Sequence, residues 1–221
     1  EGKAALDRGD IEAAGKKYIA WFRRKKINIA LPAAMSGKRD AKFDTSKADA
    51  TLGGHLDDGY NTYEVPKSGI DWDHCRLSCL TRFPILSGLS AASHHTGKIK
   101  YVRYSIDHIL EYMNAYPIET FVGKIISGGW RGGQRVARPW HWTMVCQRPQ
   151  RMCETVLLAR EYAEVQDEEL LQILQRMHEE AAYLRREMNR YLKRRHNAGP
   201  PMIKGVAICA KVLEDFKAAD E

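Results

Sequence analysis

Apolar residues follow their most regular spacing in the C-terminal third of the chain. Between Met152 and His196 there is neither glycine nor proline, and apolar residues recur at alternating intervals of four and three. This spacing places them along one side of a helix, as a seam that packs against another helix. The helix seam consists of Leu170, Leu174, Met177, Leu184, Met188 and Tyr191. We expect neighbouring helices of the same chain to cover it.

An acidic run at 167–169 indicates where this helix begins. Acidic side chains favour the first turn of a helix because they meet its positive end. We therefore place a break near residues 166–167, which makes residues 148–221 an antiparallel helical hairpin followed by a final helix. One continuous rod is the alternative.

Start signals for other elements occur earlier in the chain. Asp10 is placed to cap a helix that carries apolar residues at spacings of three and four, and Pro84 fits the first turn of another. Residues 97–105, "GKIKYVRYS", concentrate β-branched and aromatic side chains, which predicts a short strand. Ser105 is then expected to cap a further helix.

The segment 28–70 has a different composition. It is polar, is interrupted by glycine and proline, and lacks sustained periodicity. A connection of this length without regular structure is unusual inside a compact domain. We expect either an extended arm that becomes ordered against a partner or a flexible linker.

The pattern as a whole predicts a mainly α fold with short helices, a C-terminal antiparallel helical hairpin, a long irregular arm and at most a small β element. We divide the chain into four parts. Residues 1–27 form an N-terminal basic amphipathic helix, 28–70 the arm or linker, 71–147 a central mixed segment, and 148–221 the hairpin with the final helix.

Charge narrows the range of partners. The 221-residue chain carries a formal net charge of +7 and a sequence pI of about 9.1, which favours acidic partners such as nucleic acid, anionic lipid or acidic protein surfaces. No run of eighteen apolar residues occurs, so we expect no transmembrane segment. The chain begins at Glu1, which is consistent with the removal of an organellar presequence.

The stretch "SGGWRGGQRVARPWHW" at 127–142 is the strongest candidate for an interaction site. Its glycines do not have the spacing of a phosphate-binding loop or a dinucleotide fingerprint. Between Thr120 and Cys153 there is no acidic residue, whereas arginine and tryptophan are frequent. These two side chains are common anchors of protein interfaces and also bind phosphates and stack on bases. We call Trp130, Arg131, Arg135, Arg138, Trp140 and Trp142 the interaction strap; protein contact or burial in the core ranks ahead of RNA.

Residue types that bind metals are present, but their spacing is unlike that of a zinc site. Cys75, Cys79, His94 and His95 are the candidates. Zinc sites generally use two closely spaced pairs of ligands, and only one such pair occurs here. Buried free thiols are therefore the preferred interpretation, and we expect no metal and no cofactor.

No catalytic motif is present. The chain has neither a Gly-x-Ser-x-Gly elbow nor a His-Glu-x-x-His pair. The carboxylates and histidine of "DWDH" at 71–74 are explained as helix-capping groups, and His108 as a surface or half-buried histidine on a helix. We therefore expect no enzymatic activity.

These features favour a non-catalytic accessory or structural subunit of a large multiprotein assembly. Mitochondria are the expected compartment, within an energy-transducing complex or a ribosome, and the cytoplasm is the second choice. The partners would be other protein subunits, with RNA possible. The alternatives are an RNA-binding protein that uses residues 124–151 and an enzyme with an unrecognised site.

Overall fold

The computed structural model describes residues 2–27, 35, 37–57, 62–72, 83–117, 145–193 and 199–213. In these ranges the chain forms eight helices and one two-stranded antiparallel sheet. The helices are α1 (Gly2–Asp7), α2 (Ile11–Arg24), α3 (Ser46–Leu52), α4 (Pro84–Thr96), α5 (Ile99–Ala115), α8 (Arg148–Ala159), α9 (Asp167–Lys193) and α10 (Gly199–Val212). The strands are β1 (His55–Asp57) and β2 (Thr62–Glu64). The predicted mainly α fold is confirmed.

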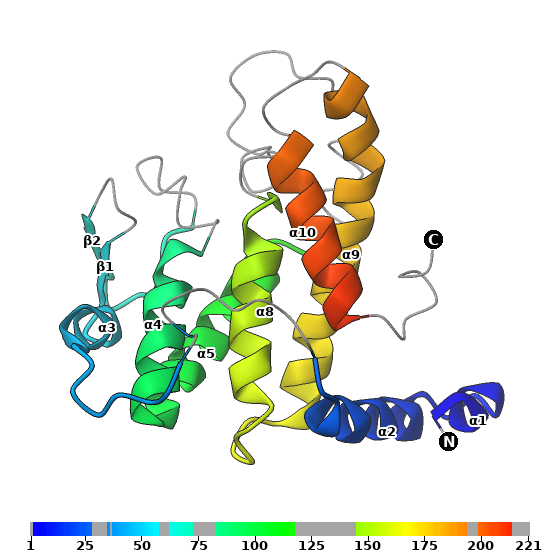
Figure 1. The fold of residues 1–221 in the computed structure, drawn as a ribbon, viewed down its shortest axis with the longest axis horizontal. Coiled ribbons are helices and arrows are strands. Elements are labelled where there is room, and N and C mark those ends of the chain that lie inside the picture. The colour runs from blue at the N-terminus through cyan, green and yellow to red at the C-terminus, as the bar shows by residue number, and fades with distance from the viewer. Residues whose placement is uncertain are drawn as a thin grey trace.

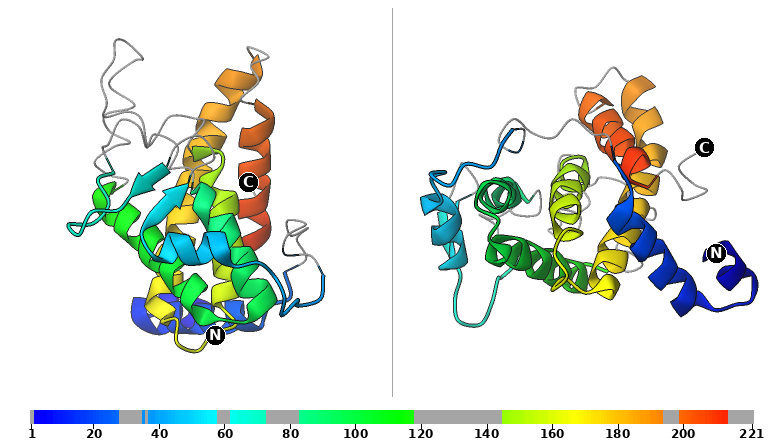
Figure 2. Two further views of the ribbon diagram at one scale, coloured as in Figure 1. Left: turned by 90° about the vertical axis from the view of Figure 1, so that its left-hand side faces the viewer. Right: turned by 60° about the horizontal axis from the view of Figure 1, so that its bottom comes forward.

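The longer helices pack in two layers (Figure 1). Helices α4, α8 and α10 stand side by side in one layer, and α5 and α9 form the layer behind it. Helix α2 crosses one end of α9, while α3 and the two strands lie beside α4 (Figures 1 and 2). The hydrophobic core fills the space between the layers, so each of the five long helices buries one side.

The C-terminal hairpin has the predicted form. Helix α8 ends at Ala159, and α9 begins at Asp167 and runs back beside it. Four residues of the helix seam, Leu170, Leu174, Met177 and Leu184, are fully buried. Met188 and Tyr191 belong to α9, but their side chains lie outside the described residues. Helices α8, α10 and α5 of the same chain supply the packing partners.

The predicted strand at 97–105 is wrong. Residues from Ile99 onward form the first turns of α5, and Ser105 lies inside this helix, where its hydroxyl donates to the Tyr101 carbonyl (2.9 Å). The residues that favour a strand also recur at helical spacing, and Tyr101, Val102 and Ile106 are buried against the core. Burial along one helix face outweighs the preference of individual residues for β structure.

Part of the segment 28–70 is regular. Helix α3, β1 and β2 lie within it, and Leu56 of β1 is buried in the core. Tyr101 of α5 donates a hydrogen bond to Asp49 of α3 (3.1 Å). These contacts attach the second half of the segment to α4 and α5, so it is part of the folded chain.

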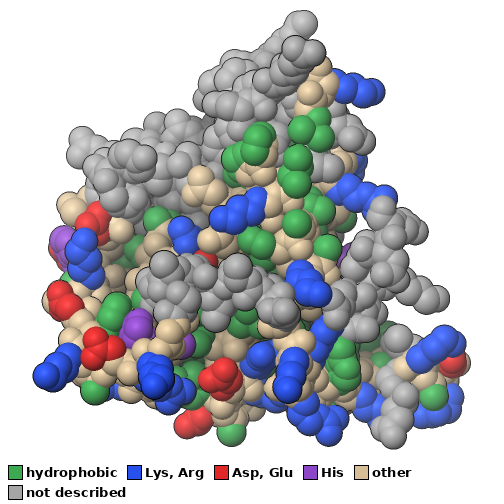
Figure 3. All heavy atoms as spheres, in the orientation of Figure 1, with side chains coloured by type: hydrophobic (Ala, Val, Ile, Leu, Met, Phe, Trp, Pro, Cys, Tyr) green, Lys and Arg blue, Asp and Glu red, His purple; other side chains and the backbone are tan. Residues whose placement is uncertain are grey.

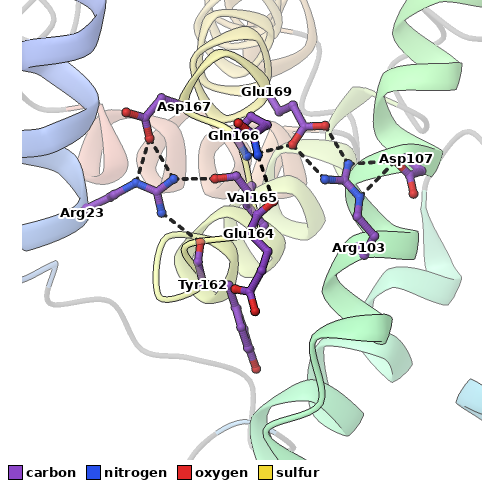
Figure 4. Close-up of polar contacts among 9 residues, drawn as sticks. All are labelled: Arg23, Arg103, Asp107, Tyr162, Glu164, Val165, Gln166, Asp167 and Glu169. Atoms are coloured by element: carbon purple, nitrogen blue, oxygen red, sulfur yellow. Dashed lines mark hydrogen bonds and ion pairs between the residues drawn. The ribbon is translucent and has the colours of Figure 1, made fainter.

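Arg23 of α2 fixes the turn between α8 and α9 (Figure 4). Its guanidinium donates to the carbonyls of Tyr162 (3.1 Å) and Val165 (2.6 Å) and pairs with Asp167 (2.8 Å). The carbonyls after a helix end have no partner within the helix, and a cation placed there satisfies several of them. Arg23 therefore holds the start of α9 against α2.

Two further arginines complete this corner. Arg160 donates in the opposite direction, to the Lys25 carbonyl at the end of α2 (2.7 Å). Arg103 of α5 binds Glu169 (2.8 Å) and Asp107 (2.7 Å), as Figure 4 shows. The beginning of α9 is thus tied to both α2 and α5.

Candidate functional site

The interaction strap lies outside the described residues, as do Cys75 and Cys79. His94 and His95, the other two metal candidates, are at the end of α4. His94 Nε2 is 3.2 Å from the carbonyl oxygen of Gly37, and the His95 ring stacks on Phe43 with centroids 4.5 Å apart. Among the described residues, no group of three or more histidine, cysteine or acidic side chains could hold a metal ion.

Three cysteines are described, and each is buried: Cys146, Cys153 and Cys209. Burial raises the pKa of Cys153 and of Cys209 far above the ordinary range. The thiolate is the reactive form of cysteine, so these two thiols are inert at neutral pH.

A cavity of about 190 Å³ opens beside α5. Its walls come from α5 and from the chain that follows β2. The lining residues are Val65, Gly69, Ile70, Tyr104, Asp107, His108 and Glu111. We call it the histidine cavity, after the lining residue His108.

His108 is only 2% exposed, and neither ring nitrogen has a hydrogen-bond partner within the described ranges. Its ring contacts are aromatic: Trp72 with centroids 4.9 Å apart, Phe83 at 5.7 Å and Tyr104 at 6.2 Å. Burial lowers the pKa of His108 to about 3. The imidazole is therefore neutral at physiological pH, with one nitrogen that donates and one that accepts. The expectation of a surface or half-buried histidine was wrong.

Phe83 adds backbone strain to this cluster. Its φ angle of 58° is the one positive value at a non-glycine residue in the described segments. Its ring packs edge-on against His108 and Tyr112, with the latter centroid 5.0 Å away. A bulky residue in the left-handed region costs on the order of 1–3 kcal/mol and persists only where the surroundings hold it. Such strain is concentrated at functional sites.

A buried ionic cluster lies where α5, α8 and α9 meet. Glu180 is fully buried and binds two guanidinium groups, those of Arg148 (3.0 Å) and Arg176 (3.2 Å). Tyr112 of α5 lies against both, with its ring 5.0 Å from the Arg148 guanidinium carbon and 5.7 Å from that of Arg176. Burial raises the pKa of Tyr112 to about 12, so its phenol is neutral.

Arg176 also reaches a second cavity, of about 180 Å³, between the end of α5 and α9. We call it the amide cavity, because three of its walls are amide side chains. It is lined by Met113, Asn114, Pro117, Gln172, Gln175, Arg176 and Glu179. An amide offers both donors and an acceptor, and arginine offers donors in a fixed fork. The exposed amides suit a ligand rich in hydroxyl groups.

Basic side chains are frequent at the edge formed by α1 and α2, as the lower edge of Figure 3 shows. Exposed Lys and Arg residues there are Lys3, Arg8, Lys16, Lys17, Arg24 and Lys26. Two of them pair with acids along the helix, Lys3 with Asp7 and Lys16 with Glu12. The edge keeps an excess of positive charge, which attracts polyanions at long range.

None of the residues that line the two cavities was predicted as a site. His108 follows Tyr104 and precedes Tyr112 at intervals of four, a spacing that places all three near one line on the helix. This spacing is the feature of the sequence that could have indicated an aromatic cluster around His108. The amide cavity is lined by residues about sixty positions apart in the sequence, so no local pattern predicts it.

No family model matches the chain, and no curated protein matches it. Solved structures do. A crystal structure of a mutant of the heparan sulfate lyase HepC from Pedobacter heparinus matches with a TM-score of 0.74 at 19% identity, and that of HepC itself with 0.72 at 18%. The crystal structure of heparinase III matches with 0.73 at 16%. Each match covers 99% of this chain and 34% of the other, so the chain spans about a third of the length of these enzymes.

The hypothesis of a non-catalytic accessory subunit of a mitochondrial assembly is overturned by this likeness, because the whole chain has a fold found in heparan sulfate lyases. That hypothesis was based on the net positive charge and on the interaction strap, which is rich in arginine and tryptophan. Both features are equally compatible with any acidic partner. None of the described helices has the length and apolar run needed to cross a lipid bilayer.

Proposed function

We propose that this chain is the helical part of a lyase that acts on an acidic polysaccharide. The observation that carries the proposal is the likeness of almost the whole chain to three structures of heparan sulfate lyases. At 16–19% identity this likeness concerns the fold. The support for the substrate class comes from the side chains of the amide cavity and of the basic edge.

The amide cavity supports a carbohydrate ligand. Asn114, Gln172 and Gln175 are exposed, so their amide groups are available to sugar hydroxyls. Arg176 is held in place below them by its bonds to the Tyr116 carbonyl (2.7 Å) and to Glu180. Arg176 is only 3% exposed, so it forms the floor of the cavity and the three amides are its accessible hydrogen-bonding groups.

The basic edge along α1 and α2 supports an acidic rather than a neutral polysaccharide. Its exposed lysines and arginines face solvent, where they raise the local concentration of a polyanion and increase the association rate. Such steering weakens with added salt, because ions screen charges separated by more than about 8 Å at physiological ionic strength.

Binding to heparan sulfate is expected to depend on the amide cavity. Replacing Asn114, Gln172 and Gln175 together with alanine is expected to weaken binding by about ten- to a thousandfold, since each lost hydrogen bond is worth roughly 0.5–1.5 kcal/mol. Titration calorimetry of the wild-type and triple-variant proteins measures this difference. The three side chains are exposed, so the variant is expected to keep its fold.

The matched control is Gln147→Ala, which removes an exposed amide that does not line the cavity. It is expected to bind as the wild type does. Equal loss in the control and the triple variant would contradict a specific site. Binding of RNA as tight as that of heparan sulfate, and equally insensitive to the triple substitution, would reduce the proposal to general attraction of polyanions.

A further inference from the structure

The outward face of α2 carries a line of alanine and basic side chains. Ala13, Lys17, Ala20 and Arg24 follow one another at intervals of four, three and four, and this spacing places them along one face of the helix. We call these four residues the α2 stripe. Lys17, Ala20 and Arg24 are exposed, and the buried residues of α2 lie on its other faces. The stripe is therefore part of the basic edge.

Positive charge dominates this part of the chain. The sequence contains no acidic residue from 13 to 39, whereas lysine and arginine are frequent. Beside the stripe, Lys16 and Arg23 are paired with acidic side chains (2.6 and 2.8 Å). The stripe itself carries Lys17 and Arg24 and no acidic side chain. It therefore favours an anionic partner.

The helix dipole accounts for only part of this charge. Cations favour the last turn of a helix because they meet its negative end, and Arg24 occupies that turn. Lys17 lies about two turns earlier, and the effect of the dipole falls off within the last turn. Seven residues of helix separate the two cations by about 10.5 Å. This separation fits a linear polyanion that bears negative groups at intervals along its length.

Arg24 presents a guanidinium whose direction is fixed. Its Nε donates to the Ala20 carbonyl (3.0 Å), and its terminal nitrogens have no acceptor among the residues described. A guanidinium binds a sulfate or carboxylate group through two parallel hydrogen bonds. Ala20, between the two cations of the stripe, is small, so a ligand chain can lie close to the helix there.

A covered tryptophan argues against nucleic acid as this ligand. Trp21 borders the stripe, because it follows Lys17 by four residues. It is half-buried, the Lys25 ammonium lies 4.3 Å from its ring centroid, and Tyr18 packs against it at 5.5 Å. Proteins that bind single-stranded nucleic acid generally offer aromatic faces on which the bases stack. Trp21 is a poor surface for such stacking, whereas Lys25 adds another cation beside Arg24.

We propose that the α2 stripe binds a sulfated segment of an acidic polysaccharide, at a site separate from the amide cavity. One sulfate group accepts from the terminal nitrogens of Arg24 and a second pairs with Lys17, while the sugar chain passes over Ala20. None of the stripe residues lines the amide cavity. The assignment to a polysaccharide rests on the proposed function, whereas the preference for a linear polyanion rests on the stripe.

An NMR titration with a sulfated heparin tetrasaccharide tests this site. In the wild type the backbone amide of Ala20 and the Nε–H of Arg24 are expected to shift, and the desulfated tetrasaccharide is expected to bind at least about tenfold more weakly. The double variant Lys17→Gln with Arg24→Gln is expected to weaken the affinity measured at Ala20 by about five- to thirtyfold, since two exposed ion pairs are lost. Both side chains are exposed, so this variant is expected to keep its fold.

The matched control is Lys204→Gln with Arg186→Gln, which removes one exposed lysine and one exposed arginine from α10 and α9. The two double variants have the same net charge, so a general loss of attraction would affect both alike. The control is expected to bind as the wild type does. An equal loss in both variants, or equal affinity for the sulfated and desulfated sugars, would overturn the site. An RNA oligonucleotide of the same charge that binds at Ala20 as tightly would overturn the assignment to a sulfated sugar.

The triple variant of the amide cavity separates this site from the proposed function. It is expected to bind the tetrasaccharide at Ala20 with the affinity of the wild type. If the tetrasaccharide binds through the stripe but heparan sulfate is not cleaved, the stripe stands and the proposed lyase fails. If heparan sulfate is cleaved and the double variant of the stripe binds and cleaves it as the wild type does, the stripe fails and the lyase stands.

Discussion

Glu180→Gln is expected to lower the free energy of unfolding by about 3–5 kcal/mol, the usual effect of breaking a buried ion pair from one side. Glu180 is fully buried and holds Arg148 and Arg176, which are 0% and 3% exposed. Removing its charge leaves two guanidinium groups in the core without the carboxylate that neutralises them. Denaturation in urea, monitored by circular dichroism, measures the change in unfolding free energy.

Glu179→Gln is the matched control for this substitution. Glu179 is the neighbouring residue of α9, is partly exposed, and contacts the Gln175 amide (3.1 Å). Its replacement is expected to change stability by less than about 0.5 kcal/mol, as for most surface substitutions. Similar effects of the two substitutions would show that the ionic cluster does not hold α5, α8 and α9 together.

Acid is expected to destabilise the protein through His108. The pKa of this group is about 3 in the folded protein, because burial opposes the charged form, and near 6.5 when the chain unfolds. Between these values the unfolded chain binds a proton that the folded protein does not, so stability falls as the pH falls. From pH 7 to pH 5 His108 alone is expected to account for a loss of about 2 kcal/mol, and the loss continues toward pH 3.

Urea denaturation at pH 7 and at pH 5 tests this contribution. In His108→Gln the difference between the two pH values is expected to shrink by about 2 kcal/mol, whatever the variant's stability at pH 7. His94→Gln, a substitution at the end of α4, is expected to retain the full pH dependence. An unchanged pH dependence in His108→Gln would show that the imidazole is accessible to protons in the folded protein.

The sequence predicted those elements whose signals are local. The helix seam in α9 and the cap of α2 follow from spacing and from one side chain, and Asp10 does accept from the backbone N–H of Ala13 (3.0 Å). Residues 99–105 were misassigned because their composition favours a strand, whereas their packing against α4 and α8 decides for a helix.

The cavities could not be predicted, because they depend on contacts between distant segments. The amide cavity needs the end of α5 beside α9, and the histidine cavity needs the chain after β2 beside α5. The burial of His108 likewise depends on Trp72 and Phe83, which come from a different part of the chain. Charge and composition predict an acidic partner but not its chemistry, since RNA, acidic proteins and acidic polysaccharides are all attracted by a basic surface.

The most direct test of the proposed function is the product formed from heparan sulfate. A lyase cleaves by elimination, so each cleavage leaves a new carbon–carbon double bond that absorbs ultraviolet light when conjugated. Incubating heparan sulfate with the lyase of which this chain is proposed to be the helical part is expected to produce this absorbance together with shorter chains on gel filtration, and the triple variant of the amide cavity is expected to do so more slowly. Tight binding without any new double bond, or no binding at all, would contradict a polysaccharide lyase.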